Sequence, residues 1–280
     1  RRHTRSFHVT GVQTCALPIS EAFEKMSLYC DVDKDAIVAL PNAETVYEVP
    51  LRMEESGIGE YICKRLSLDC KKPNLVKWND LVDKIKSEKP SLKVGVIAKY
   101  MTNEDTYLSV FEALRSAGWY YNYDIDIVWV DAEKLSEDEL GALNLDGIVV
   151  PGGFGVRGLE GKIIAAKYAR ENQLPYLGLC LGMQVAVIEF ARYVGLENAN
   201  SEEFDSDTKY KVVHFIAGQE KIKKKAATMR LGAYDCELSK DSLAFDLYKK
   251  KIISERHRHR YEVNDALIDE KFDKEGFRIT

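Results

Sequence analysis

The sequence predicts an α/β fold, a three-layer sandwich around a mostly parallel central sheet. Between about residues 92 and 280, short apolar runs alternate with segments of helical period, as in β-α-β units. The run Gly147–Val150 is apolar throughout, as expected of a strand that is buried on both faces. Residues 21–75 lack this alternation, so we expect them to form the tail of a different domain.

The segment before residue 92 contains short elements that do not repeat. The predicted pieces are, in order, a strand at 37–40, a turn at 42–45 that leads into 46–49, and helices at 50–56 and 60–68 that Gly57 and Gly59 separate. Residues 76–91 are predicted to be a linker with one polar amphipathic helix, because their charge is high and prolines bracket them.

The segment from residue 92 onward is predicted to form the core domain. Four strands are expected, at 93–98, 125–130, 147–150 and 176–179. Four helices alternate with them, at 104–117, 133–143, 162–171 and 184–194.

The first twenty residues, RRHTRSFHVTGVQTCALPIS, are predicted to contribute nothing to the core. Their apolar stretch Cys15–Ile19 is shorter than the roughly 7–15 apolar residues of a signal-peptide core. They have neither a helical nor a strand period. We interpret residues 1–20 as a non-native segment, similar to translated sequencing-adapter read-through, or as a disordered tail.

Composition excludes several classes of protein. The 280 residues carry 40 basic and 45 acidic side chains, a net charge of −5, which argues against a general nucleic-acid binder. No apolar run approaches the roughly 20 residues that span a bilayer. The six cysteines are too sparse for a disulfide scaffold, and no zinc site is evident. These features favour a soluble protein in the reducing cytoplasm.

The pentapeptide Gly178-Leu179-Cys180-Leu181-Gly182 lies between a predicted strand and a predicted helix. Glycines on both sides of a nucleophile are typical of a sharp strand-to-helix turn, a nucleophile elbow. Such a turn would expose the thiol at a helix N-terminus, where the dipole favours the thiolate. The backbone N–H of Leu181 would then point to where an oxyanion forms. A buried cysteine in a tight turn fits the same residues.

A glycine-rich loop, Pro151–Gly158, directly follows the apolar strand. Four glycines in eight residues let backbone amides approach a ligand closely, as in phosphate-binding loops. The loop lacks the Lys-Ser/Thr of a P-loop and the spacing of the dinucleotide fingerprint. Beside Cys180 it could instead supply the second N–H donor of an oxyanion hole.

The run Glu255–Asn264 alternates arginine with histidine. With a period of two, the two residue types would lie on opposite faces of a strand. Too few basic residues are present for nucleic-acid binding, and glutamates flank them. A solvated strand edge is the plain interpretation.

Together these stretches resemble the CTP synthase family and its class I glutamine amidotransferase domain. The resemblance covers about residues 21–280. Its most particular motifs are the Pro151–Gly158 loop and the Glu255–Asn264 run. The other matching stretches are the Cys180 elbow with Met183-Gln184, and residues 47–51, 61–65, 197–201 and 228–233. The resemblance implies the end of a synthetase (amidoligase) domain at 21–75 and an amidotransferase domain at 92–280.

The resemblance also implies roles for individual residues. Cys180 would attack the side-chain amide of glutamine and form a thioester, with the backbone N–H of Leu181 in the oxyanion hole. The substrate glutamine would be bound by residues of the elbow, the loop and two later segments: Gly153, Leu181, Gly182, Met183, Gln184, Glu203 and Arg260. Glu203 would hold its α-amino group and Arg260 its carboxylate, which are sensible charge pairings. Arg157 would lie near the allosteric activator GTP.

The resemblance further implies ligands for a whole enzyme of this family. That enzyme aminates UTP to CTP with ATP, Mg²⁺ and ammonia from glutamine, is activated by GTP, and is a cytoplasmic homo-oligomer, a tetramer. We expect no nucleic-acid or membrane partner, and no metal or cofactor on these residues.

Two parts of the family pattern are missing from these 280 residues. A reactive cysteine requires a base and a group that orients the base. The family supplies a histidine and a glutamate two residues apart near its C-terminus, but no His-x-Glu follows Tyr261 here. The nucleotide-binding lysine motif of the synthetase half is also missing. We therefore expect an inactive fragment of a CTP synthase, truncated at its C-terminus.

Two alternatives remain open at this stage. One is a non-catalytic binding module that retains the amidotransferase fold. The other is a free-standing glutaminase subunit that serves a different acceptor. The synthetase-like stretch and the Arg-His run argue against the second alternative.

Overall fold

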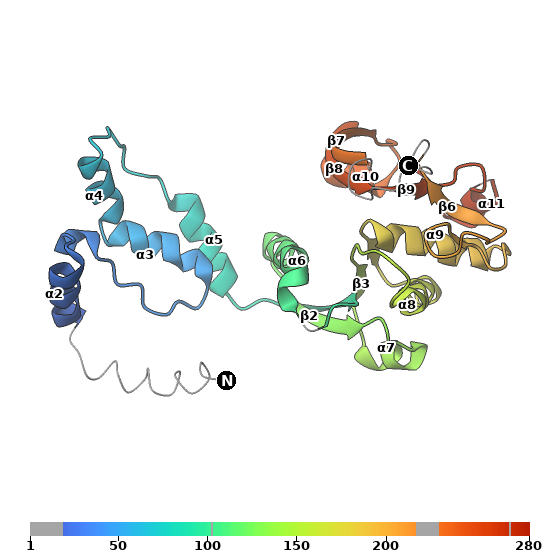
Figure 1. The fold of residues 1–280 in the computed structure, drawn as a ribbon, viewed down its shortest axis with the longest axis horizontal. Coiled ribbons are helices and arrows are strands. Elements are labelled where there is room, and N and C mark those ends of the chain that lie inside the picture. The colour runs from blue at the N-terminus through green and yellow to red at the C-terminus, as the bar shows by residue number, and fades with distance from the viewer. Residues whose placement is uncertain (1–18, 102, 217–229, 269) are drawn as a thin grey trace. The chain divides into compact units, whose positions relative to one another are not determined.

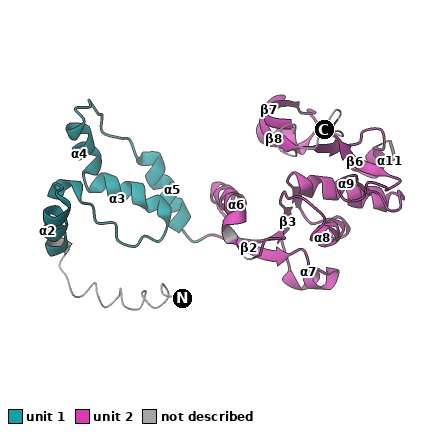
Figure 2. Cartoon of the chain, in the orientation of Figure 1, with its two compact units in different colours: residues 1–88 teal, residues 89–280 magenta. Residues whose placement is uncertain are grey.

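The computed structural model describes residues 19–101, 103–216, 230–268 and 270–280. The chain divides into two compact units, residues 1–88 and 89–280 (Figure 2). Most of the segment interpreted as non-native, and Thr228 and Met229 of one matching stretch, lie outside the described residues. No described helix is both long enough and apolar enough to cross a membrane.

The first unit is helical in its described part. Its elements are α2 (Ile19–Cys30), η1 (Lys34–Ala36), η2 (Val46–Glu48), α3 (Val49–Glu55), α4 (Ile58–Arg65) and α5 (Val76–Lys86). The indole Nε1 of Trp78 in α5 donates to the Tyr47 carbonyl at 2.7 Å. Glu48 is buried and pairs with Lys86 at 2.6 Å and with Arg52 at 3.0 Å. These contacts join α5 to the η2–α3 segment.

The predicted strand at 37–40 is wrong. Ile37–Leu40 is neither helix nor strand, and the described residues of this unit include no strand with which it could pair. The composition of a short apolar run favours a strand, but a strand forms only where a neighbouring strand provides hydrogen-bond partners. The run at 46–49 forms a helical turn and enters α3. Gly57 separates α3 from α4 with φ 78°, as predicted, whereas Gly59 lies inside α4.

Cys63 and Cys70 form a disulfide that the sequence analysis did not anticipate. It links two residues seven positions apart in the sequence, at the end of α4. Of the other described cysteines, Cys30 and Cys236 are exposed and Cys180 is half-buried, and all three are free thiols.

The second unit is built on a four-stranded parallel sheet of order β2-β1-β3-β4. Figure 1 labels two of its strands, β2 and β3. The strands are β1 (Ser91–Ala98), β2 (Asp124–Asp131), β3 (Gly147–Val150) and β4 (Tyr176–Gly178). Helices alternate with them: α6 (Leu108–Tyr121), α7 (Glu137–Leu143), α8 (Leu159–Glu171) and α9 (Leu181–Tyr193). The α/β class and the parallel sheet agree with the prediction, and β3 has the predicted bounds.

Helices cover both faces of this sheet. Val96 and Val149 pack with Phe111 of α6 on one face. Their neighbours Ile97 and Ile148 point to the other face and pack with α7 and α8. Successive side chains of a strand point to opposite faces, so an apolar run is what a doubly covered strand requires.

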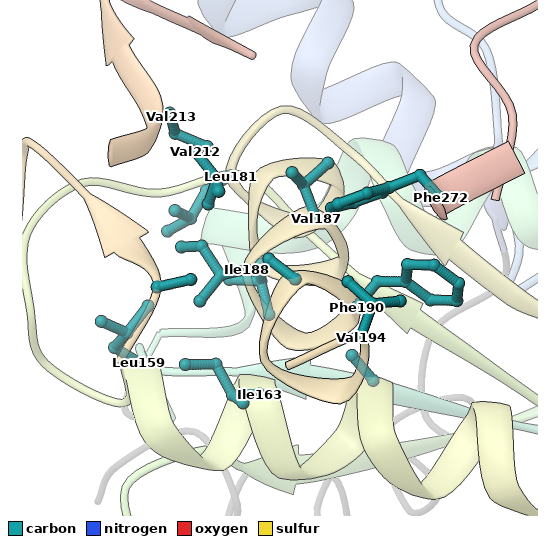
Figure 3. Packing of buried hydrophobic residues seen from close by; sticks show 14 residues of the cluster. Leu159, Ile163, Leu181, Val187, Ile188, Phe190, Val194, Val212, Val213 and Phe272 are labelled. Carbon is teal, nitrogen blue, oxygen red and sulfur yellow. The ribbon is translucent and has the colours of Figure 1, made fainter. Parts of the chain in front are cut away.

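A further core lies around α9. Ile188 and Phe190 of α9 pack with Ile163 of α8 and with Phe272, and Val213 joins them from a second sheet (Figure 3). That sheet has the order β5-β6-β9, with β5 (Asn200–Ser201), β6 (Lys211–Phe215) and β9 (Tyr261–Val263). The cluster fixes α9, and with it the turn that precedes α9.

The first half of the Arg-His run, residues 255–259, lies in one strand of an antiparallel ribbon, and residues 261–263 form β9 of the sheet described above. β8 (Ile252–His259) pairs with β7 (Arg230–Glu237), and Arg258 and His257 lie opposite Leu231 and Gly232. Arg256 and Arg258 are exposed, whereas His257 and His259 are half-buried. This is the alternation that a period of two predicts. The 3-10 helix η3 (Glu104–Tyr107) and the two short helices α10 (Leu243–Tyr248) and α11 (Glu270–Lys274) complete the described elements.

Candidate active site

Cys180 occupies a strained turn between β4 and α9. Its backbone has φ 55° and ψ −108°, a combination that residues with a side chain seldom adopt. The N–H of Leu179 donates to the Val150 carbonyl at 2.9 Å, and the N–H of Gly182 donates to the Leu179 carbonyl at 3.0 Å. The turn is thereby bonded to the end of β3 and closed on itself.

Two glycines make the turn possible. A methyl group on Gly178 would lie 2.5 Å from the backbone of Gly182 and Met183. A methyl group on Gly182 would lie 2.0 Å from the Val150 carbonyl oxygen. Any side chain at either position would push α9 away from the sheet and displace Cys180.

Gly182→Ala is expected to destabilise the chain by about 3 kcal/mol, the upper range for overpacking a close contact. The clash is with backbone, which cannot rotate away, and it outweighs the higher helix propensity of alanine. Chemical denaturation of the two purified proteins measures the difference.

The matched control is Gly141→Ala in α7. A methyl group there would meet nothing closer than 3.8 Å, so alanine should be neutral or stabilise by about 0.5–1 kcal/mol. Equal stability of Gly182→Ala and the wild type would show that α9 does not lie against Val150 as described.

The glycine-rich loop faces the elbow. A methyl group on Gly152 would lie 3.3 Å from the Cβ of Cys180 and 3.7 Å from its Sγ. The backbone N–H groups of Leu181 and Gly153 both act on the Cys180 sulfur and lower the pKa of its thiol. Two amides that converge on one atom can also hold the oxygen of a tetrahedral intermediate formed there.

The environment of Cys180 raises the pKa of its thiol. Burial is the largest cause, because it disfavours the charged thiolate, and the nearby Glu203 carboxylate adds to it. The N–H groups of Leu181 and Gly153 and the ammonium of Lys162 act in the opposite direction. The position at a helix N-terminus predicted a thiol that ionises readily, but the net direction of the pKa is upward because of burial.

Glu203 and Arg157 are held against the loop. The Glu203 carboxylate accepts from the N–H of Gly155 at 3.0 Å. Arg157 donates to the Lys99 carbonyl at 2.9 Å and pairs with Glu133 at 3.0 Å. Glu203 therefore presents negative charge near Cys180, and Arg157 is directed toward the end of β1.

The remaining predicted residues lie around the start of α9. Gln184 is only 5% exposed and its Nε2 donates to the Tyr261 carbonyl at 3.5 Å. Met183 is 42% exposed and lines a cavity of about 640 Å³ together with His214. The Arg260 guanidinium lies 5.7 Å from the centre of the Phe215 ring, and its buried Nε has no hydrogen-bond partner among the described residues.

Two buried lysines beside the loop were missed by the sequence analysis. Lys99 is 3% exposed and donates to the Phe154 carbonyl. Lys162 is fully buried and donates to the Pro151 carbonyl at 3.2 Å. A signal existed for the second lysine, because at helical spacing it shares a face with Leu159 and Ile163.

No histidine hydrogen-bonds to Cys180 in the described ranges. His257 and His259 pair with each other, with their Nδ1 atoms 3.3 Å apart. His214 belongs to β6 and lies beside Met183 in the cavity described above. Within the same ranges no group of three or more His, Cys, Asp or Glu side chains could hold a metal ion.

The fold and the elbow define a class-I glutamine amidotransferase domain. The family model described as Glutamine amidotransferase class-I matches residues 103–280. The glutaminase domain of the Trypanosoma brucei CTPS, solved with bound acivicin, aligns with a TM-score of 0.60 and 42% identity. The alignment covers 66% of this chain and 72% of that one.

A second family model, described as CTP synthase N-terminus, matches residues 12–68. The CTP synthase of Methanocaldococcus jannaschii is 49% identical over 258 residues, 89% of this chain and 48% of the relative. That of Bacillus velezensis is 43% identical over 265 residues, 93% of this chain and 49% of the relative. This chain belongs to the CTP synthase family, and it spans about half the length of these relatives.

Proposed function

We propose that this chain supplies the glutamine-hydrolysing part of a CTP synthase. The observation that carries the proposal is the strained turn at Cys180, where two backbone N–H groups converge on the sulfur. An amide oxygen placed near those N–H groups would bring its carbon to the thiol.

The proposed reaction forms and breaks a thioester. The Cys180 sulfur adds to the side-chain carbonyl of glutamine, and the N–H groups of Gly153 and Leu181 stabilise the oxygen that becomes negative. The C–N bond then breaks, and ammonia leaves after its nitrogen takes up the thiol proton. Water hydrolyses the thioester, which restores the thiol and releases glutamate.

The proposed glutamine site uses charges on either side of the elbow. Glu203 lies close enough to Cys180 to affect the pKa of its thiol, which supports a role in which its carboxylate would bind the α-amino group. Arg260 affects the pKa of the neighbouring Tyr261 and would bind the carboxylate. Gly182, Met183 and Gln184 would line the side of the site formed by α9.

The proposal extends to the whole enzyme. In the whole enzyme, the ammonia would aminate UTP to CTP in a reaction that consumes ATP and uses Mg²⁺. That reaction would take place in the region of the relatives that this chain does not match. GTP would act as activator close to Arg157, and the enzyme would be a cytoplasmic homo-tetramer. These 280 residues by themselves would bind glutamine without turning it over.

Acivicin provides the test. We expect it to alkylate Cys180 slowly in the purified chain and excess glutamine to slow the labelling, because both compounds would compete for one site. Peptide mapping by mass spectrometry locates the adduct and measures its rate of formation.

Cys236, an exposed free thiol, serves as the internal control, since its slow background labelling should not respond to glutamine. Glu203→Gln and Arg260→Met should weaken the protection by glutamine. Labelling of Cys180 that glutamine leaves unchanged would count against a glutamine site.

A further inference from the structure

Lys162 is buried where its helix runs beneath the glycine-rich loop. Its side chain is 0% exposed, and its Nζ lies 3.2 Å from the carbonyl oxygen of Pro151. The preceding residue, Gly161, explains the burial. A methyl group on Gly161 would lie 1.9 Å from the Ala132 carbonyl, so α8 packs backbone to backbone at this point.

Lys99 holds the other end of the same loop. Its Nζ donates to the Phe154 carbonyl, and a methyl group on Gly153 would lie 3.2 Å from its Cε. Two ammonium groups thus bond to carbonyls on either side of Gly152 and Gly153. With those carbonyls held by lysines, the N–H of Gly153 faces the sulfur of Cys180.

Lys162 and Cys180 also interact electrostatically. Burial, reinforced by the charge of Lys99, lowers the pKa of Lys162 to about 8, and a negative charge on Cys180 raises it. By the same interaction the ammonium lowers the pKa of the thiol. Burying a charge with one carbonyl partner costs free energy that an apolar side chain would avoid. A merely space-filling role would therefore be served better by methionine.

We propose that Lys162 is a positioning residue for the nucleophile: its ammonium holds the Pro151 carbonyl, aims the loop amides at Cys180 and supports the thiolate. This role rests on the glutamine hydrolysis proposed above. It predicts a reactivity of Cys180 that can be measured without glutamine.

The test is the pH dependence of Cys180 alkylation by iodoacetamide in the 280-residue chain, followed by peptide mapping. In Lys162→Met we expect the curve to move to higher pH and alkylation at pH 7 to slow about threefold to fourfold. A tenfold loss of thiolate accompanies each unit of rise in pKa. The higher nucleophilicity of a more basic thiolate offsets part of that loss.

Lys167→Met is the matched control, because Lys167 lies on the same helix and pairs with Glu137 at the surface. Its alkylation curve should equal that of the wild type. A folded Lys162→Met with the wild-type curve would overturn the proposal.

Lys162→Gln separates charge from folding, because it retains a hydrogen-bond donor without the charge. It should show the same upward movement of the curve. If circular dichroism shows that neither Lys162 variant folds, the lysine is a structural residue and the proposal fails. Failure of glutamine protection in the acivicin experiment, by contrast, would leave this result unaffected.

Discussion

Replacing Cys180 by alanine is expected to abolish glutamine-dependent CTP formation and to leave ammonia-dependent formation intact. The thiol would serve only the release of ammonia, whereas amination of UTP would take place elsewhere in the enzyme. Loss of a thiol or hydroxyl nucleophile costs about a million-fold in kcat in a well-studied hydrolase. CTP formation with each nitrogen source, measured side by side, gives the result.

A chimera provides the setting for this experiment. Residues 19–280 would replace the matching region of the Methanocaldococcus jannaschii CTP synthase, which is 49% identical over 258 residues. Cys236→Ala is the matched control, because that cysteine is an exposed free thiol in β7. Equal loss of both activities in the Cys180 variant would show that Cys180 supports the fold or the amination step.

A polypeptide of these 280 residues is expected to release glutamate from glutamine no faster than its Cys180→Ala variant. The nucleophile, its base and the group that orients the base act as a unit, and removing one costs about three or more orders of magnitude. His214, His257 and His259 make no hydrogen bond to Cys180 in the described residues. If none of these histidines acts as the base, neither departure of ammonia nor attack of water on the thioester would be assisted.

Measuring glutamate by a coupled assay distinguishes the possible outcomes. Robust release that depends on Cys180 would mean that one of the three histidines acts as the base. Single replacements of His214, His257 and His259 by glutamine would then identify it. Binding of glutamine without release would agree with the proposed division of the enzyme.

The sequence predicts the parallel sheet of the second unit well because its two inner strands, β1 and β3, are largely buried, whereas β5, β6 and β7 were not predicted. Gly147–Val150 has no polar residue, and β3 lies at the centre of a sheet that helices cover on both faces. The same criterion failed at Ile37–Leu40, where the apolar run finds no partner strand in the described residues. Strand formation depends on a distant neighbour, so the composition of a short run cannot settle it.

The position of the nucleophile was also predictable, but its electrostatics were not. Glycines at 178 and 182 imply a tight turn whatever surrounds it. Burial raises the pKa of the Cys180 thiol, whereas Lys162 and two backbone N–H groups lower it. The balance between these effects can be read only from the packed structure. Helical spacing puts Lys162 on the apolar face of α8, but the closeness of α8 to Ala132, which buries the lysine completely, is seen only in the structure.

The left-handed backbone at Cys180 bears on any attempt to engineer a sturdier version of this domain. A residue held in such a conformation stores about 1–3 kcal/mol of strain, which the surrounding packing must maintain. A search that rewards thermal stability alone would favour glycine at this position and would eliminate the thiol. Stabilising changes are better sought away from residues 178–182, at sites such as Gly141, where an added methyl group meets no close neighbour.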